Sequence, residues 1–246
     1  MTTSTGPAPL SPTARSTVVR GRTRAVSERE VLHAFLAEGL VAHLGVVVGA
    51  GASAHPVVLP TAYAVDLAGP DAGGSLYLHG SVAARWLRAS VDATVCVTVT
   101  EVDGVVTARS AFHHSMNYRS AVVIGRARWV DDDAERGRAL DLIVDHLVPG
   151  RAATLRPSTR KELSATAVLA VPLAEASMKA RDGGPVDDPD DVAAGVWGGH
   201  LPLRRVCDGP VSAPDSHARV PGDVAARAAA YGVRPAPVSG GHGRAR

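Results

Sequence analysis

The chain has 246 residues, a formal net charge of +2, a sequence pI of about 8.7 and a mean hydropathy of +0.07; hydrophobic residues make up 46%, charged residues 20% and aromatic residues 4%. This composition predicts a soluble globular protein whose core rests on Val, Leu and Ala, and it gives no support to a nucleic-acid-binding surface. No segment has the roughly 18 to 20 apolar residues of a membrane span or the apolar core of a signal peptide. The two cysteines, Cys96 and Cys207, predict neither a disulfide framework nor a zinc site, so a cytoplasmic protein is expected.

The beginning of the chain predicts a tail followed by a helix. Residues 1–24 are rich in Ser, Thr, Pro and Arg and show no periodicity, which predicts a disordered tail. Ser27 and Glu30 have the spacing of a capping box, and apolar residues follow at helical intervals. A helix is therefore expected over residues 27–38.

Short strands follow this helix. Apolar, β-branched runs bounded by glycine or proline predict strands over residues 40–48, 56–65 and 75–80. Pro56 and Pro60 place the second of these at a sheet edge, because proline cannot donate a backbone hydrogen bond. A short helix is expected to begin at Ser81 and to extend over residues 81–90.

The second half of the chain continues the hairpin pattern. Asp103 and Gly104 are the strongest short-range hairpin signal, so two strands within residues 93–112 are expected to meet there. The other regular elements are a strand over 118–130, a helix over 131–148 and a strand over 164–173. Residues 209–246, rich in Pro, Ala, Gly and Arg, predict a disordered C-terminal tail, which leaves 25–208 as the folded domain. Consecutive hairpins favour an antiparallel barrel with peripheral helices over βαβ units.

A glycine-rich segment has the spacing of a dinucleotide-binding loop. Gly49, Gly51 and Ala54 fit the pattern G-x-G-x-x-A, and Asp66 and Asp71 lie near the expected position of a ribose-binding acid. A helix must follow such a loop, and here it would contain two prolines at a cost of about 3 kcal/mol each. The segment is therefore interpreted as a hairpin turn, and a Rossmann dehydrogenase is only a formal competitor.

A better phosphate site lies further along the chain. The strand that ends at His79, Gly80 and Ser81 leads directly into the predicted helix, with Arg85 one turn inside it. Backbone N–H groups, a hydroxyl and a guanidinium could then converge on a phosphate. In the alternative interpretation, Ser81 only caps the helix and Arg85 points into water.

The densest polar cluster contains His113, His114, Asn117, Tyr118 and Arg119. Adjacent residues on extended backbone point to opposite faces, so the two histidines do not favour a metal site. Contacts to a ligand, or hydrogen bonds within a loop, are the two interpretations that remain.

Trp197 lies in a glycine-rich stretch and leaves two interpretations open. It could cover a planar ligand, or it could anchor the core of a protein that has few aromatic residues. Because the chain has no G-x-S-x-G elbow, nothing in it supports Ser-His-Asp catalysis.

Three segments, LYLHGSVAARWLRA, VTARSAFHHSMNYRSAVVIGRAR and VWGGHLPL, resemble the pyridoxamine 5′-phosphate oxidase-related family. The likeness is greatest to its flavin-nucleotide-binding branch, which includes the nitroimidazole-resistance (Nim-type) proteins, and it covers about residues 20–205. It implies a mainly β, α+β fold, namely a six-stranded antiparallel split β-barrel with peripheral helices. It also implies a homodimer with FMN at the subunit interface.

The resemblance also implies which residues bind the cofactor. The turn from His79 to Arg85 would hold the FMN phosphate, the strand around Pro60 would lie along the isoalloxazine, and Trp197 would close over the site, from either subunit. The full implied set is Pro60, Thr61, Tyr63, His79, Gly80, Ser81, Arg85, Asn117, Tyr118, Arg119, Ser120 and Trp197. No catalytic acid or base and no metal ligand is assigned.

The chain departs from the oxidases of that family at several positions. Ser120 replaces a glutamine, Ala84-Arg85-Trp86 replaces Ser-Arg-Lys, and HPVVLPTAY replaces the usual Arg-x-x-x-Lys strand. The C-terminal Arg-x-His pair that reads the phosphate of the vitamin has no counterpart. Pyridoxamine 5′-phosphate is therefore not the expected substrate.

The leading hypothesis is an FMN-dependent oxidoreductase that transfers hydride or electrons to or from a small organic molecule. The alternative is a non-enzymatic module that stores or senses a flavin, a deazaflavin or haem in the same barrel. Neither the electron donor nor the substrate follows from the residues.

Overall fold

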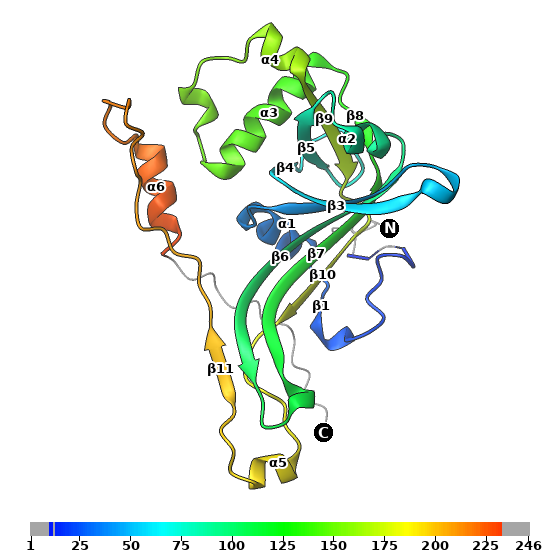
Figure 1. Cartoon of the computed structure of the whole chain (residues 1–246), viewed down its shortest axis with the longest axis vertical. Helices are drawn as coiled ribbons and strands as arrows, with labels where there is room; N and C mark the ends of the chain where they lie inside the picture. Colours follow the sequence, from blue (N-terminus) through cyan, green and yellow to red (C-terminus); the bar gives the residue numbers. More distant parts are fainter. Residues whose placement is uncertain (1–9, 12, 233–246) are drawn as a thin grey trace, which may run out of the picture.

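The strands of the protein form two antiparallel sheets in the computed structural model, which describes residues 10–11 and 13–232 (Figure 1). Sheet A has the strand order β1-β10-β7-β6-β2-β3, with β11 paired to β6. Its strands are β1 (Ala25–Val26), β2 (Ala42–Val48), β3 (His55–Thr61), β6 (Thr94–Thr107), β7 (Ser115–Arg126), β10 (Ala176–Arg181) and β11 (Gly199–Pro202). Sheet B has the order β4-β5-β9-β8, with β4 (Tyr63–Asp66), β5 (Ser75–Ser81), β8 (Arg128–Trp129) and β9 (Thr166–Pro172).

Helices lie around the two sheets, which confirms the predicted α+β class. They are α1 (Arg29–Glu38), α2 (Arg85–Ser90), α3 (Asp133–Leu147), α4 (Arg160–Ala165), α5 (Pro189–Ala193) and α6 (Gly222–Ala230). The described residues also form the short 3-10 turns η1 (Arg22–Arg24), η2 (Gly51–Ser53), η3 (Ala111–His113) and η4 (Ala152–Thr154). α1 contacts strands of both sheets, and α3 packs on sheet B. Residues 102–118 of β6 and β7 form, together with β11, an arm that projects away from sheet B and carries α5 near its end (Figure 1).

The expected hairpin turn at Asp103 and Gly104 is wrong. β6 continues through both residues, and its register with β7 shifts between Val102 and Gly104, which is a β-bulge. β11 joins β6 beside the bulge, where the N–H of Leu203 donates to the carbonyl of Asp103 over 3.0 Å. The turn between β6 and β7 instead contains η3. β11, which follows about a hundred residues later in the sequence, thus pairs with β6 at this dipeptide, which forms a bulge and not a turn.

The predicted strand over residues 56–65 is two strands in different sheets. β3 pairs with β2 at the edge of sheet A, as the two prolines predicted, and β4 begins at Tyr63 in sheet B. The glycine-rich segment before β3 is the predicted hairpin turn. Gly49 has a φ of +88°, and a Cβ there would lie 2.7 Å from the carbonyl oxygen of Ser53.

The predicted capping box at Ser27 and Glu30 is also wrong. α1 begins at Arg29 after the N-cap residue Glu28, and the hydroxyl of Ser27 donates to the carboxylate of Glu28 over 3.0 Å. A capping box occurs instead at the start of α4, where Thr159 and Glu162 each accept a backbone N–H from the other.

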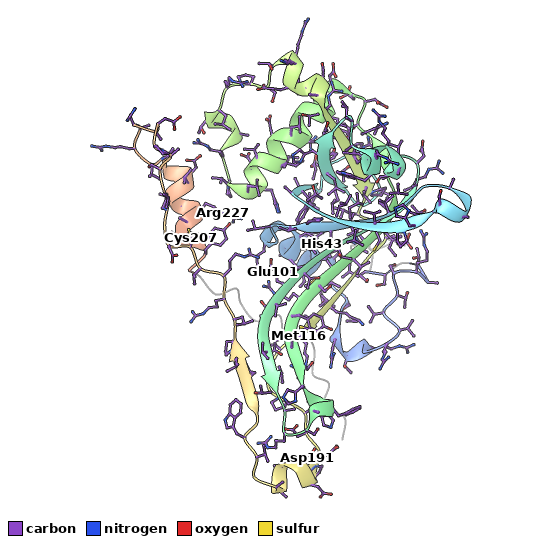
Figure 2. All side chains as sticks on the ribbon, in the orientation of Figure 1. His43, Glu101, Met116, Asp191, Cys207 and Arg227 are labelled. Carbon is purple, nitrogen blue, oxygen red and sulfur yellow. The ribbon has the colours of Figure 1, made fainter. Side chains whose placement is uncertain are left out.

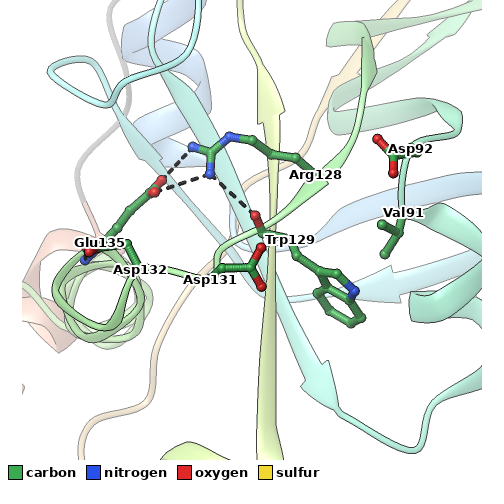
Figure 3. A pocket seen from close by; sticks show the side chains of 7 residues that line it. All are labelled: Val91, Asp92, Arg128, Trp129, Asp131, Asp132 and Glu135. Atoms are coloured by element: carbon green, nitrogen blue, oxygen red, sulfur yellow. Dashed lines mark hydrogen bonds and ion pairs between the residues drawn. The ribbon is translucent and has the colours of Figure 1, made fainter.

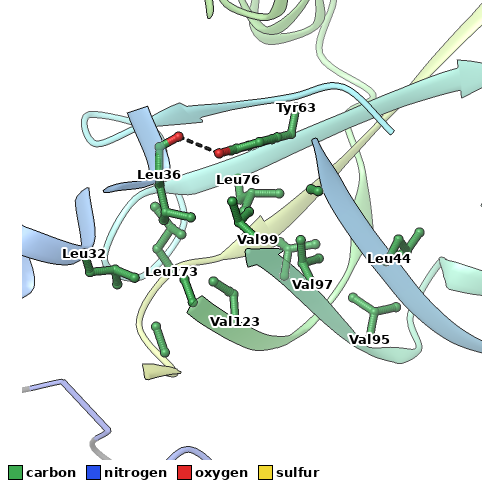
Figure 4. Close-up of a cluster of buried hydrophobic side chains, with 14 of the residues drawn as sticks. Leu32, Leu36, Leu44, Tyr63, Leu76, Val95, Val97, Val99, Val123 and Leu173 are labelled. Atoms are coloured by element: carbon green, nitrogen blue, oxygen red, sulfur yellow. Dashed lines mark hydrogen bonds between the residues drawn. The ribbon is translucent and has the colours of Figure 1, made fainter. Parts of the chain in front are cut away.

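The core lies between the two sheets and α1 (Figure 4). Alternate residues of β2, β6 and β7 point into it, among them the fully buried Leu44, Val97 and Val123. Tyr63 is also fully buried, and its hydroxyl donates to the carbonyl oxygen of Leu36 over 2.6 Å, which ties β4 to the last turn of α1. Burial raises the pKa of Tyr63 above its ordinary value, so the phenol remains protonated and donates.

Tyr63→Phe is expected to lower the free energy of unfolding by about 1 to 2 kcal/mol, because it leaves the carbonyl of Leu36 without its donor. Urea unfolding at neutral pH measures the change. Tyr231→Phe is the control, because the ring of Tyr231 contacts the guanidinium of Arg227 and its hydroxyl makes no hydrogen bond within the described residues. Equal losses in the two variants would contradict the role given to the Tyr63 hydroxyl.

The two segments expected to be disordered lie partly outside the described residues. Within the described part, Leu10 is buried, Arg15 pairs with Glu175 at 2.6 Å, and Asp223 of α6 pairs with Arg151 at 3.5 Å. The limits of the folded domain at residues 25 and 208 stay predictions. In the part of the chain that the structure covers, every helix is too short or too polar to cross a bilayer.

Candidate functional site

The turn between β5 and α2 differs from its prediction. Ser81 pairs with Thr166 as the last residue of β5, and α2 begins only at Arg85, so the expected helix start at Ser81 is wrong. The backbone N–H groups of the turn have partners within the protein: Ala83 donates to the hydroxyl of Ser81 over 3.2 Å and Ala84 to its carbonyl over 2.9 Å. The turn therefore offers an anion few free N–H groups.

Arg85 provides the positive charge of this turn. Its side chain is exposed and has no hydrogen bond or ion pair with any residue that the structure describes. Arg88, one turn later in α2, is already engaged, because its Nε donates to the carbonyl of Val82 over 3.2 Å. Arg85 is thus the guanidinium that remains available to a phosphate.

Gly80 and His79 lie on opposite faces of β5. A Cβ on Gly80 would lie 2.6 Å from Cδ1 of Leu87, so the missing side chain lets α2 pack closely against this strand. Strand alternation points His79 to the other face, where its Nδ1 is buried without a partner among the described residues. Burial lowers the pKa of His79, so at neutral pH it is uncharged and adds no cation to the turn.

The face of sheet A that points away from the core, here called the outer face, carries a second group of the predicted residues. The strand register aligns His43 with Pro60 on one side and Thr98 on the other, and Thr98 with Val122. Ser120 lies in the next row, 3.2 Å from the hydroxyl of Thr100. This face is apolar and hydroxyl-bearing: other members are Gly45, Val47, Val58, Cys96 and Ile124. Val58 is 65% exposed.

Asn117 and Arg119 point to the opposite side from Tyr118 and Ser120, because they alternate along β7. The Arg119 side chain is only 11% exposed. It donates to both oxygens of Asp103 over 2.9 and 3.0 Å, pairs with Glu38 at the end of α1, and lies 5.3 Å from the ring centre of Phe35. These two carboxylates hold the pKa of Arg119 above its ordinary value despite its burial. In this structure the guanidinium joins α1, β6 and β7.

The other predicted residues also lie apart from the β5–α2 turn. Asn117 donates to the carbonyl of Gly183 over 3.1 Å and accepts from Arg181, and the hydroxyl of Thr61 donates to the carbonyl of Ala62. Trp197 is 66% exposed and belongs to the segment between α5 and β11. That segment lies at the end of the arm away from sheet B (Figure 1). One protomer therefore does not bring the predicted set into a single pocket.

A charged pocket that the sequence did not indicate lies beside β8 (Figure 3). Its volume is about 430 Å³, and its lining residues are Val91, Asp92, Arg128, Trp129, Asp131, Asp132 and Glu135. Arg128 donates to both oxygens of Asp71 over 2.8 Å and also pairs with Glu135, and these contacts raise its pKa. Asp71 is thus an ion-pair partner and not a ribose ligand, and Asp66 likewise pairs with Arg138. No group of three or more metal-ligating side chains occurs among the described residues.

Comparisons with known proteins agree with this architecture. The family model of pyridoxamine 5′-phosphate oxidase matches residues 28–180. A flavocytochrome, Anf3 from Azotobacter vinelandii, is 35% identical with a TM-score of 0.78, over 88% of this chain and 97% of that one. The FAD and haem binding protein from Mycobacterium smegmatis is 38% identical with a TM-score of 0.73, over 82% of this chain and 95% of that one.

A more distant structure shares the fold. A candidate 5-nitroimidazole antibiotic resistance protein from Bacteroides thetaiotaomicron is 18% identical with a TM-score of 0.50, over 63% of this chain and 85% of that one. The curated proteins contain no match. Together with the two sheets, these similarities confirm the split-barrel fold.

Proposed function

The chain belongs to the pyridoxamine 5′-phosphate oxidase family, and on that premise we propose that it binds a flavin nucleotide and transfers electrons or hydride to or from a small organic substrate. The observation that carries the proposal is the similarity to two cofactor-binding proteins over more than four fifths of the chain. FMN, or the FMN half of FAD, is the group proposed for the β5–α2 turn. Pyridoxamine 5′-phosphate is not the proposed substrate.

The residues of the turn fit the phosphate of a flavin nucleotide. Among the residues that the structure describes, Arg85 has no hydrogen-bond or ion-pair partner, and the hydroxyl of Ser81 lies at the strand end beside it. The bound flavin would supply the redox chemistry, while the protein holds the phosphate, orients the ring system and excludes water from it. His79, neutral and half-buried on β5, is the histidine nearest in sequence to this turn.

We further propose that the chain forms a homodimer through its outer face. The exposed valines of β2 and β3 make this face apolar, and such a patch favours a protein partner. In a twofold dimer the same face would occur twice, and the flavin would lie at its border. The arm would then bring Trp197 toward the second protomer.

Haem is the second cofactor proposed, because the two similar proteins, the flavocytochrome Anf3 and the FAD and haem binding protein, are named for a cytochrome or for haem. The described residues fit this group, since exposed imidazoles are present whose other ring nitrogen bonds to a backbone carbonyl, as at His55 and His114. Such an imidazole nitrogen would hold the iron of a bound haem.

Absorption spectra of the purified chain test both cofactors. A flavin spectrum that bleaches on addition of a reduced nicotinamide supports the oxidoreductase, and chromatography of the released cofactor distinguishes FMN, FAD and a deazaflavin. A flavin that no reductant or acceptor oxidises or reduces would favour the storage or sensing alternative. A chain that takes up neither FMN nor FAD would contradict the proposal.

Arg85→Ala is expected to weaken flavin binding by about 1 to 3 kcal/mol, or roughly 5- to 150-fold, because it removes a charge-assisted contact to phosphate. Fluorescence titration of the cofactor-free chain with FMN and FAD measures the change. Arg88→Ala is the matched control on the same helix, since the Nε of Arg88 is bonded to Val82. Riboflavin, which has no phosphate, should bind wild type and Arg85→Ala equally. Unchanged FMN affinity in Arg85→Ala would refute the assignment.

A further inference from the structure

The turn at the tip of the arm holds an imidazole whose two ring nitrogens have different roles. Nδ1 of the exposed His114 lies 2.8 Å from the carbonyl oxygen of Ser110. A carbonyl oxygen only accepts hydrogen bonds, so Nδ1 carries the proton and Nε2 of the neutral ring keeps its lone pair. Histidines that bind metals have this arrangement, in which a carbonyl or carboxylate holds the other ring N–H.

His55 shares this arrangement, with Nδ1 at 2.9 Å from the carbonyl oxygen of Ser53. Two other histidines use Nε2 for such a contact, His113 toward Asp188 and His146 toward Gly39, which leaves only the nitrogen next to the backbone. No hydrogen bond to the protein orients the remaining described imidazoles, which are His33, His43, His79, His200 and His217. His55 and His114 are therefore the described histidines whose Nε2, at the outer end of the side chain, is prepared for a ligand.

The surroundings distinguish His114 from His55. Two residues to either side of His114 lie Phe112, 89% exposed, and Met116, 52% exposed. Met116 stands opposite Val105 of β6, and Val105 stands opposite Leu201 of β11, so an exposed apolar row crosses the arm (Figure 2 labels Met116). His55 has smaller apolar neighbours: Gly, Ala and Ser precede it, and the exposed apolar side chains near it are Val47, at 60%, and Val58, at 65%. Within the described residues, the arm therefore places an oriented imidazole beside the larger exposed apolar side chains, Phe112 and Met116.

The surroundings of His114 indicate which metal-containing group it suits. With no cluster of three His, Cys, Asp or Glu side chains among the described residues, the arm cannot surround a bare zinc ion. Haem brings four nitrogens of its own and needs from the protein an axial ligand and apolar contacts for the macrocycle. We infer that His114 is an axial ligand of haem iron and that the apolar row of the arm contacts the porphyrin. This inference rests on the haem part of the proposed function.

Hemin titration of the full chain, after removal of bound cofactors, tests the assignment. His114→Ala is expected to lower hemin affinity about tenfold or more and to abolish the histidine-ligand features in the absorption and EPR spectra. Added imidazole should restore those features, because it supplies the missing nitrogen. His55→Ala should retain the wild-type affinity and spectra, and FMN and FAD binding should be equal in all three proteins.

His114→Tyr keeps the assignment falsifiable should the alanine variant fail to fold. It is expected to replace the histidine-ligand spectrum with that of a phenolate ligand. Wild-type spectra in His114→Ala or in His114→Tyr would overturn the assignment, as would their loss in His55→Ala alone. A wild-type chain that takes up flavin but not hemin would overturn this inference and leave the flavin proposal standing, whereas uptake of neither would overturn both.

Discussion

Arg119→Ala is expected to lower the free energy of unfolding by about 2 kcal/mol, because it removes charge-assisted hydrogen bonds from a buried guanidinium to two half-exposed carboxylates. Arg119 carries the positive charge between Glu38 and Asp103, and its guanidinium also covers the ring of Phe35. The variant would thus loosen α1 from β6 and β7 together. Urea unfolding followed by circular dichroism measures the loss.

The matched control is Arg126→Ala on the same strand. Arg126 pairs with Asp92 at 3.3 Å, but both side chains are more than 70% exposed, at 72% and 71%. Such a pair contributes about 0 to 1 kcal/mol, so the control should unfold close to wild type. If the two variants lost similar stability, the structural role of Arg119 would be wrong. If Arg119→Ala kept wild-type stability and lost flavin affinity, Arg119 would be a cofactor ligand, as the family resemblance implies.

Val122→Glu is expected to convert the proposed homodimer into a monomer. Val122 lies near the middle of the outer face, in the row with His43 and Thr98, so a twofold interface would bury two new carboxylates. Like charges forced together at an interface cost several kcal/mol, and about 3 kcal/mol raises the dissociation constant roughly a hundredfold. Sedimentation of wild type and variant over a range of concentrations measures the change.

Leu155→Glu is the control for this prediction. Leu155 is an exposed apolar residue that follows η4 and does not belong to sheet A, so its substitution should leave the dimer intact. The urea midpoint of Val122→Glu, measured at a concentration where both proteins are monomeric, should remain near wild type because Val122 is only half-buried in the protomer. A dimer that persists in Val122→Glu, or a wild-type monomer, would contradict the proposed interface.

The fold class could be predicted because it depends on sequence patterns within short segments. Alternating apolar residues and proline-marked edges predicted antiparallel strands, and the acidic first turn predicted α3, whose N-cap Asp132 accepts the N–H of Glu135 over 2.7 Å. The dipeptide of Asp103 and Gly104 misled because its partners, Arg119 and Leu203, come from other parts of the chain. A local rule cannot choose between a turn and a bulge when a distant strand makes the difference.

The candidate site was less predictable for the same reason. Period-two alternation already separates Asn117 and Arg119 from Tyr118 and Ser120, and that signal was available in the sequence. The sequence did not show which of the two faces α1 covers, because this depends on how the helix crosses the sheet. That Arg85 forms no ion pair with any described residue likewise depends on how distant segments pack around α2, which the sequence does not show.

The contact between Gly80 and α2 has a consequence for how strongly an anion can be held. Leu87 fits against the bare backbone of β5, so the helix that carries Arg85 is fixed before any ligand arrives. Binding then has to immobilise only one side chain, at about 0.5 to 1.5 kcal/mol, and not a whole turn of backbone. The backbone of the turn loses its conformational entropy when the protein folds, and not when the ligand binds. Most of the attraction between guanidinium and phosphate therefore contributes to the binding free energy.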